Sequence, residues 1–379
     1  MYISQRHLLN LKAALKPGKV VVIYGARRTG KTTLLHAFLR DETRPYLFVS
    51  GEDITVQSYL ASQSIEKLKA FVGTNRLLVV DEAQRVAHIG LNLKLLVDHV
   101  PELCIIATGS SSFDLARQVG EPLTGRKTTL IQFPLAQLEI ASTEQRHETD
   151  AHLESRLLYG SYPEVVLMQD IRERESYLRE IVASYLYKDI LELESIRQSA
   201  KIARLLQLLA FQIGKEVSYT ELGSSLGMSK NTVNHYLDLL EKAFVLRRLG
   251  GFSRNLRTEV TKNSRYYFID CGIRNALVQN FNQLALRNDA GELWENYLIM
   301  ERLKRQAYLQ EDASSYFWRT YSQKEIDLVQ EQAGALHGFE MKWGQNRATP
   351  PREWTSAYPN ASWQLIHRDN YLPFIGAAT

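Results

Sequence analysis

The sequence predicts an α/β fold that begins with a parallel sheet covered by helices. Three observations support this prediction. Residues 20–24, 76–81 and 103–109 are short apolar runs typical of buried parallel strands. A segment with helical spacing of apolar residues, at 34–39, follows the first run. Further short runs at 46–50 and 130–133 add a second and a fifth strand. Strands that alternate with helices form such a sheet, with ligands at the carboxyl ends of its strands.

The first apolar run leads directly into a glycine loop, GARRTGKTT, at residues 25–33. The spacing matches G-x-x-x-x-G-K-[ST], in which backbone N–H groups and a helix N-terminus hold phosphates. Lys31 is expected to reach the β- and γ-phosphates, and the Thr32 hydroxyl to ligate Mg²⁺. The predicted cofactors are therefore ATP and Mg²⁺. The residues expected to surround them are Gly25, Ala26, Arg27, Arg28, Thr29, Gly30, Lys31, Thr32 and Thr33.

The strand at residues 76–81 ends in an acidic pair about fifty residues after the glycine loop. It reads RLLVVD and is followed by Glu82, which is the pattern of a Walker B strand. Asp81 is expected to hold Mg²⁺ directly or through water, and Glu82 to polarise the attacking water. The alternative is an ordinary strand that ends in a charged turn.

Two further motifs complete the predicted nucleotide site. Residues 103–109 read LCIIATG and precede a serine run, so Thr108 and Ser110 are candidates for sensing the γ-phosphate; a serine-rich turn is the alternative. Arg126 lies in a Gly-Arg turn before the fifth strand. An arginine supplied to a neighbour's ATP can be worth about 10³–10⁵ in rate, and the alternative is a solvated turn residue. We expect all four motifs at carboxyl ends of strands.

The motifs GARRTGKTT, LLVVDEAQ, ATGSSS and LTGRKTTLIQFPL follow one another in this order. Together they resemble the prokaryotic AAA-type ATPases whose chains continue into a domain of unknown function, DUF4143. The resemblance implies a P-loop ATPase core of the additional-strand type, which we place at residues 1–136. It also covers the tail, through YFWRTYSQKEIDLV and GFEMKW. If Arg126 acts in trans, a homo-oligomeric ring such as a hexamer follows.

The middle of the chain contains a helix-turn-helix pattern. Residues 137–199 are expected to form a helical lid or linker, and residues 200–275 a winged helix-turn-helix. Helices at 202–213, 218–226 and 230–244 surround a Gly-Met-Ser turn, and strands at 245–249 and 265–269 flank a basic loop. Residues 244–275 contain seven basic and two acidic residues, a local charge of +5, which favours DNA as partner. The predicted DNA-binding residues are Lys230, Asn231, Arg254, Arg257 and Lys262. Docking of a protein is the alternative.

The last third, residues 276–379, carries a nuclease-like pattern. A helix at 293–307, strands at 316–319, 325–330 and 336–343, a helix at 353–358 and a strand at 363–367 give the order αβββαβ. Asp327 and, 13 residues later, Glu340-x-Lys342 follow the PD-(D/E)XK arrangement. Asp327 and Glu340 are suited to Mg²⁺, Lys342 shares a strand face with Glu340, and Glu295 is expected to add a ligand. The alternative is charged pairs on exposed strand faces.

Composition restricts the class of protein. The chain has 379 residues with 45% hydrophobic and 23% charged residues, ordinary values for a globular protein. Cys104 and Cys271 are too few and too far apart for a metal or redox motif, so we expect free buried thiols. No apolar run approaches the ~18 residues of a membrane span, so we expect a cytoplasmic protein without a membrane partner.

The predicted function is a DNA-processing ATPase, a motor or remodeller with a nuclease-like tail. Two alternatives stay open. One is a nucleotide-dependent switch or scaffold with an inactive tail and a protein partner. The other is a metal-dependent DNA nuclease gated by ATP.

Overall fold

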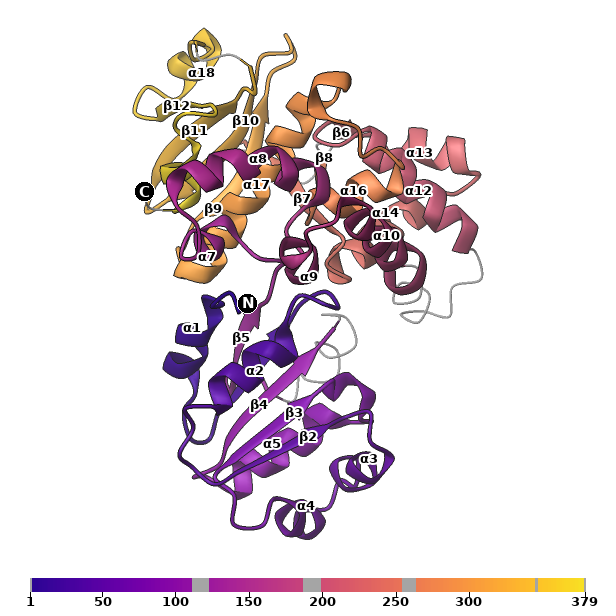
Figure 1. Cartoon of the computed structure of the whole chain (residues 1–379), viewed down its shortest axis with the longest axis vertical. Coiled ribbons are helices and arrows are strands. Elements are labelled where there is room, and N and C mark those ends of the chain that lie inside the picture. The colour runs from indigo at the N-terminus through magenta and orange to yellow at the C-terminus, as the bar shows by residue number, and fades with distance from the viewer. Residues whose placement is uncertain (1, 111–122, 187–198, 254–263, 345–346, 378–379) are drawn as a thin grey trace. The chain divides into compact units, whose positions relative to one another are not determined.

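The computed structural model describes residues 2–110, 123–186, 199–253, 264–344 and 347–377 (Figure 1). The chain divides into two compact units. Residues 4–134 and 242–244 form the first, which we call the sheet unit. Residues 1–3, 135–241 and 245–379 form the second, which we call the tail unit. Each unit is described by itself.

The sheet unit is built on five parallel strands, as the sequence predicts. Their order is β2 (Tyr46–Ser50), β3 (Leu77–Asp81), β4 (Cys104–Gly109), β1 (Val20–Tyr24) and β5 (Lys127–Ile131). β4 lies between β1 and β3 and pairs in parallel with both. The strand that carries the glycine loop and the strand that ends in Asp81 are therefore separated by one additional strand, which confirms the predicted class.

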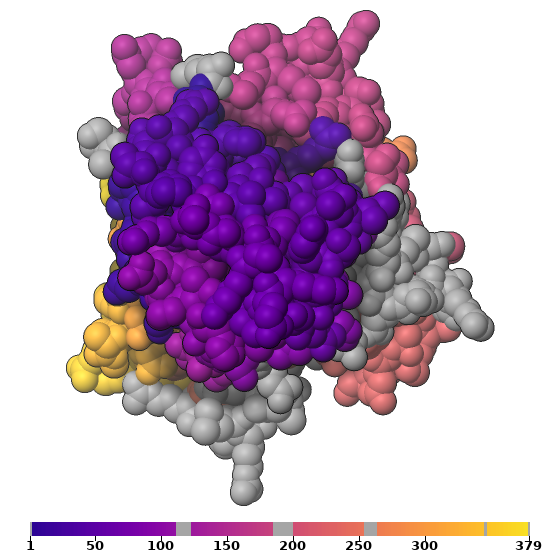
Figure 2. All heavy atoms as spheres, turned by 90° about the horizontal axis from the view of Figure 1, so that it is seen from below, coloured from indigo at the N-terminus to yellow at the C-terminus, as the bar shows by residue number. Residues whose placement is uncertain are grey.

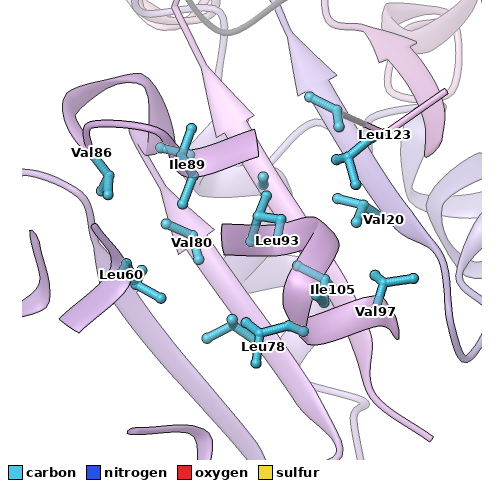
Figure 3. Packing of buried hydrophobic residues seen from close by; sticks show 14 of the residues in the cluster. Val20, Leu60, Leu78, Val80, Val86, Ile89, Leu93, Val97, Ile105 and Leu123 are labelled. Atoms are coloured by element: carbon cyan, nitrogen blue, oxygen red, sulfur yellow. The ribbon is translucent and has the colours of Figure 1, made fainter. Parts of the chain in front are cut away.

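Alternation along β1 explains how helices cover both faces of this sheet. Val20 and Val22 pack on α3 (Ile54–Leu60), α4 (Ile65–Val72) and α5 (Ile89–His99), where Figure 3 shows Val20, Leu78 and Val80 beside Leu93. Val21 and Ile23 face the opposite side, with α1 (His7–Ala14) and α2 (Lys31–Leu39). Both sides of each central strand are buried, which is why these strands are continuous apolar runs. Figure 2 shows the outer surface of this unit in indigo and purple.

The tail unit begins with helices, in the segment 137–199 for which we expected a helical lid or linker. These are α7 (Gln137–Ile140), α8 (Arg146–Tyr159), α9 (Pro163–Leu167), α10 (Ile171–Glu180) and the π-helix η2 (Ile181–Leu186). Three more helices follow, α12 (Ser199–Phe211), α13 (Tyr219–Leu226) and α14 (Lys230–Lys242). The expected helix–turn–helix elements are thus α13 and α14. Their turn is tight, because a Cβ at Gly223 would lie 2.6 Å from the Met228 carbonyl oxygen.

A seven-stranded sheet runs through the rest of the tail unit. Its order is β12 (Ser362–Ile366), β11 (Ala335–Met341), β10 (Glu325–Gln332), β9 (Ser314–Arg319), β7 (Leu246–Gly251), β8 (Ser264–Phe268) and β6 (Glu216–Val217). The remaining helical segments are α16 (Cys271–Leu277), η3 (Leu284–Leu286), α17 (Ala290–Leu309), α18 (Arg352–Ala357) and α19 (Tyr371–Ile375).

The order α17, β9, β10, β11, α18 and β12 is the αβββαβ order that the sequence predicts. β7 pairs in parallel with β9, so the strands after the helix–turn–helix elements and those of the tail form one sheet. The boundary expected between residues 275 and 276 therefore falls inside a continuous unit.

Two smaller expectations concern the cysteines and Lys342. Cys104 and Cys271 are free and buried, as predicted. β11 ends at Met341, so Lys342 lies just beyond the strand in which it was expected. In the described part of the chain, none of the helices has the length and apolar character needed to cross a membrane.

Candidate functional site

The glycine loop between β1 and α2 depends on two glycines. A Cβ at Gly25 would lie 2.1 Å from the Gln132 carbonyl oxygen, so a larger residue cannot occupy this position without moving β5. Gly30 has φ +90° and caps α2, a left-handed conformation that favours glycine. Arg28 also has positive φ, at +61°. The loop thus turns sharply twice and delivers Lys31 as the first residue of α2.

Lys31 is held inside this loop. Its side chain is buried, and Nζ donates hydrogen bonds to the carbonyl oxygens of Gly25 (3.0 Å) and Ala26 (2.9 Å). The hydroxyl of Thr29 also donates to the Ala26 carbonyl, at 2.9 Å. The ammonium group therefore lies where the loop closes, which is the place that the predicted phosphate contact requires.

Two glutamines brace the loop, and the sequence analysis did not identify either. Gln5 Nε2 donates to the carbonyl oxygens of Thr29 (3.3 Å) and Gly30 (3.2 Å). Gln132 Nε2 lies 3.5 Å from the Thr29 oxygen and 3.2 Å from that of Phe133. Gln132 directly follows β5, so an amide at the carboxyl end of a strand was the available signal.

Asp81 joins three elements at the carboxyl edge of the sheet. Thr32 Oγ1 on α2 donates to Asp81 Oδ2 at 2.7 Å. Thr108 Oγ1 at the end of β4 donates to Asp81 Oδ1, and accepts the backbone N–H of Glu82 at 3.1 Å. The structure therefore brings together Thr32, Asp81, Glu82 and Thr108, all of which the sequence had assigned to the nucleotide site.

Glu82 is held by a neighbour in the same DEAQ motif. Gln84 Nε2 donates to Glu82 Oε2 at 2.6 Å and to Ser110 Oγ at 3.1 Å. Glu82 has φ +50°, which turns the chain sharply after β3. Gln84 received no role from the sequence, although it stands in the motif, because its contact with Ser110 depends on the pairing of β3 with β4.

Arg126 does not lie at the carboxyl edge, and this corrects the expected placement. It precedes Lys127, which pairs with Val20 at the start of β1. The glycine loop follows the other end of β1, five residues away, about 16 Å at roughly 3.3 Å per residue. Arg126 Nη2 instead lies 2.9 Å from Asp98 Oδ1 on α5. A role toward its own nucleotide site is therefore excluded by distance, and a role in trans stays a prediction.

The residues at the carboxyl edge fit ATP and Mg²⁺. The backbone at Gly25 has no Cβ and lies close to the Gln132 carbonyl oxygen, and Lys31 supplies a cation beside it. The Thr32 hydroxyl and the Asp81 carboxylate share one hydrogen bond, so two oxygen ligands of the kind that Mg²⁺ prefers lie side by side.

Two residues of the nuclease-like pattern, Glu295 and Asp327, lie beside an arginine that the sequence analysis did not assign to this pattern. Arg265 on β8 has Nη1 at 3.5 Å from Glu295 Oε1 and at 3.7 Å from Asp327 Oδ1. Its Nη2 lies 2.6 Å from Glu325 Oε2. Lys342 Nζ lies 2.7 Å from Glu340 Oε1. We call Arg265, Glu295, Glu325 and Asp327 the Arg265 cluster.

Burial shifts the protonation of the cluster carboxyls. Desolvation raises the pKa of Glu295 to about 7, against the opposing effect of the Arg265 charge. Desolvation also raises the pKa of Asp327 well above its usual range, and the charges of Glu295 and Glu340 add to this effect. Among the described residues, no group of three or more His, Cys, Asp or Glu side chains is arranged to hold a metal ion.

The predicted DNA-binding residues divide into two groups. Lys230 and Asn231 are exposed at the start of α14, and Ser229 Oγ accepts the Thr232 backbone N–H at 3.1 Å beside them. Arg254, Arg257 and Lys262 lie outside the described residues.

Comparison with protein families divides the chain into three matched segments. Residues 17–141 match an AAA domain, and residues 290–367 match a domain of unknown function, DUF4143. Residues 150–284, between them, match another domain of unknown function, DUF8612. The first and last matches confirm the family resemblance that the sequence motifs indicated.

The chain is also similar to uncharacterised proteins of distant organisms. One from Mycobacterium tuberculosis is 28% identical over 335 residues, covering 88% of this chain and 72% of that protein. One from Methanocaldococcus jannaschii is 26% identical over 339 residues, covering 84% and 74%.

Similar solved structures include a signal transduction ATPase with numerous domains and a tetratricopeptide repeat sensor, from Pyrococcus horikoshii. It is 13% identical with a TM-score of 0.29, over 82% of this chain and 48% of that one. A RuvB variant from Thermotoga maritima is 16% identical with a TM-score of 0.32, over 61% and 82%.

Proposed function

We propose that this chain, an AAA-type P-loop ATPase that continues into a DUF4143 region, hydrolyses ATP at the carboxyl edge of its five-stranded sheet. The observation that carries the proposal is the Asp81 junction, where Thr32 from α2 and Thr108 from β4 both donate to one carboxylate. These two hydrogen bonds link α2, β3 and β4, the three elements that must surround a γ-phosphate.

Each residue of the junction has a separate task in this proposal. Lys31 binds phosphate oxygens, and Thr32 and Asp81 supply oxygen ligands to Mg²⁺. The chemistry that bound Mg²⁺ supplies is neutralisation of charge on the phosphates. Glu82 orients and polarises the attacking water, and Gln84 holds the Glu82 carboxylate, 2.6 Å away, in position. Thr108 bonds both the Asp81 carboxylate and the Glu82 backbone N–H. A movement of either residue would therefore also move the end of β4.

The proposed use of this hydrolysis is work on DNA. Lys230 and Asn231 are exposed at the start of α14, after the turn at residues 227–229, and the proposal assigns this helix end the role of a recognition helix. Arg247 and Arg248 are exposed on the adjacent strand β7, and the basic residues of segment 254–262 follow it in the sequence. A winged helix of this charge would hold DNA mainly through phosphate contacts, with a strong dependence on salt.

The test is the steady-state ATPase rate of the full chain with and without DNA. Single-stranded, duplex and branched DNA are compared, with Lys31→Ala as the blank. Stimulation by DNA, weakened by salt, supports the proposal. Hydrolysis that DNA leaves unchanged would reject DNA as the working partner.

A second function is favoured by one observation, the position of Arg265 among the tail carboxylates. The positive charge of Arg265 offsets the negative charges of these carboxylates, as expected for a scaffold instead of a nuclease. The protein would then be a nucleotide-dependent switch with a protein partner. It would change conformation on binding ATP and hydrolyse it slowly whether or not DNA is present.

A further inference from the structure

The two carboxylates best placed to begin a metal site in the tail face the same atom. Glu295 Oε1, from α17, and Asp327 Oδ1, from β10, lie 3.5 and 3.7 Å from Arg265 Nη1. Mg²⁺ and Ca²⁺ need carboxylate oxygens at about 2.0–2.6 Å. An ion bound by both oxygens would have to lie close to the position that this nitrogen occupies.

Arg265 is fixed in that position from several directions. Its side chain is 4% exposed, and its guanidinium lies 4.7 Å from the centre of the Phe317 ring. Its backbone is in β8, which pairs with β6 on one side and β7 on the other. A guanidinium stays charged at every physiological pH, so no ordinary change in pH removes this cation.

The predicted ligands also contact other donors within the chain. Asp327 Oδ2 accepts the Met341 backbone N–H at 2.8 Å. Glu295 Oε1 also accepts the Tyr267 hydroxyl at 2.6 Å. Glu340 Oε1 is 2.7 Å from Lys342 Nζ. The residues present therefore do not fit a divalent metal in this arrangement.

We propose that Arg265 is the built-in cation of the Arg265 cluster and takes the place of a metal ion there. The cluster joins β8, next to the helix–turn–helix elements, to β10 by a charge-assisted hydrogen bond from Arg265 to Glu325, and to α17 by the ion pair with Glu295. It does not bind Mg²⁺ or Mn²⁺. This inference does not depend on the proposed ATPase function, because every group in it lies in the tail unit.

The test counts Mn²⁺ bound to the full chain without nucleotide, by electron paramagnetic resonance. Four proteins are compared: wild type, Asp327→Asn, Arg265→Met and the double variant. Two pairs differ only by Asp327→Asn: wild type with Asp327→Asn, and Arg265→Met with the double variant. Any Mn²⁺ held at the ATPase site is present in both proteins of a pair, so a difference in the number of ions within a pair comes from the cluster. Arg305→Met is the matched control, since Arg305 lies on α17 with Glu295 and pairs with Glu311 at 2.9 Å, which is outside the cluster.

The expected result is an equal number of Mn²⁺ ions on wild type and Asp327→Asn. Arg265→Met should bind one ion more than the double variant, and Arg305→Met should gain none. One more ion on wild type than on Asp327→Asn would overturn the inference. Equal numbers on Arg265→Met and the double variant would also overturn it, because Arg265 would then not be what excludes the metal.

The comparison of wild type with Asp327→Asn decides the question even if Arg265→Met fails to fold. Glu295→Gln gives the same comparison at a second carboxylate. A loss of one ion on that substitution would contradict the inference, and no loss would support it.

Discussion

Thr32 Oγ1 lies 2.7 Å from Asp81 Oδ2, so the first turn of α2 is joined to the end of β3. Because the two oxygens are adjacent, we expect both to act on one Mg²⁺ ion. Thr32→Ala should lower the ATPase rate by about 10- to 100-fold, the range found when groups around a metal are removed.

Thr55→Ala is the control for this prediction, because Thr55 is exposed on α3 of the same unit. The rate is measured at saturating ATP over a range of Mg²⁺ concentrations. Excess Mg²⁺ should recover part of the Thr32→Ala rate. An unchanged rate in Thr32→Ala would show that Asp81 holds the metal without it.

Gln84 is predicted to position Glu82, which it contacts at 2.6 Å. Gln84→Leu removes this hydrogen bond and leaves the phosphate loop intact. The expected effect is a drop in kcat with little change in KM, because water orientation contributes to the transition state and not to ATP binding. A raised KM with normal kcat would instead assign Gln84 to nucleotide binding.

Gly25→Ala should disrupt the phosphate loop through the backbone. The added Cβ would lie 2.1 Å from the Gln132 carbonyl oxygen, so β1 or β5 must shift, at a cost of about 1–3 kcal/mol. Nucleotide affinity and the melting temperature should both fall. Gly291→Ala is the matched control, since a Cβ added at Gly291 would meet no atom of the described residues within 4 Å. A Gly25→Ala protein that binds ATP normally would contradict this geometry.

His7 predicts a dependence of stability on pH. Its Nε2 is 2.8 Å from the Ile131 carbonyl oxygen, and burial lowers its pKa to about 4 from 6.5. The unfolded chain therefore binds more protons than the folded chain between these values. The free energy of unfolding is therefore highest above pH 6.5, and His7 lowers it by about 3 kcal/mol as the pH falls toward 4.

Chemical denaturation of wild type and His7→Gln at several pH values measures this effect. The free energy of unfolding of His7→Gln should change less between pH 6.5 and 4. Parallel curves for the two proteins would mean that His7 is not the group responsible.

The start of α14 predicts how DNA affinity depends on charge. Lys230→Ala with Asn231→Ala should weaken DNA binding and reduce the slope of log affinity against log salt by about 1, for one lost phosphate contact. Lys69→Ala is the control, because Lys69 is exposed on α4 of the sheet unit. An equal effect of the control would indicate general attraction between charges instead of a defined contact.

The sequence predicted most of the ATPase core because its signals are local. The five strands, the glycine loop and the Asp81–Glu82 pair each depend on a few consecutive residues. Gln5 was missed because it lies 25 residues from Gly30, whose carbonyl oxygen it contacts only after α1 packs on the sheet. The carboxyl-edge position of Arg126 was wrong because a turn before a strand places its residue at the opposite edge.

The tail shows the same contrast between local and long-range signals. The αβββαβ order followed from local patterns, and the structure has it. The partner of the carboxylates could not be predicted, because Arg265 is 60 residues before Glu325 and belongs to a strand expected in another domain. Only the pairing of β7 with β9 brings the two strand sets into one sheet.

We propose that ATP is hydrolysed at the Asp81 junction to act on DNA, and the ATPase rate of the full chain with and without DNA is the decisive measurement. We predict slow hydrolysis without DNA, clear stimulation by DNA at low salt, and no activity in Lys31→Ala. A wild-type rate that is the same with single-stranded, duplex and branched DNA would contradict the claim and favour a switch with a protein partner.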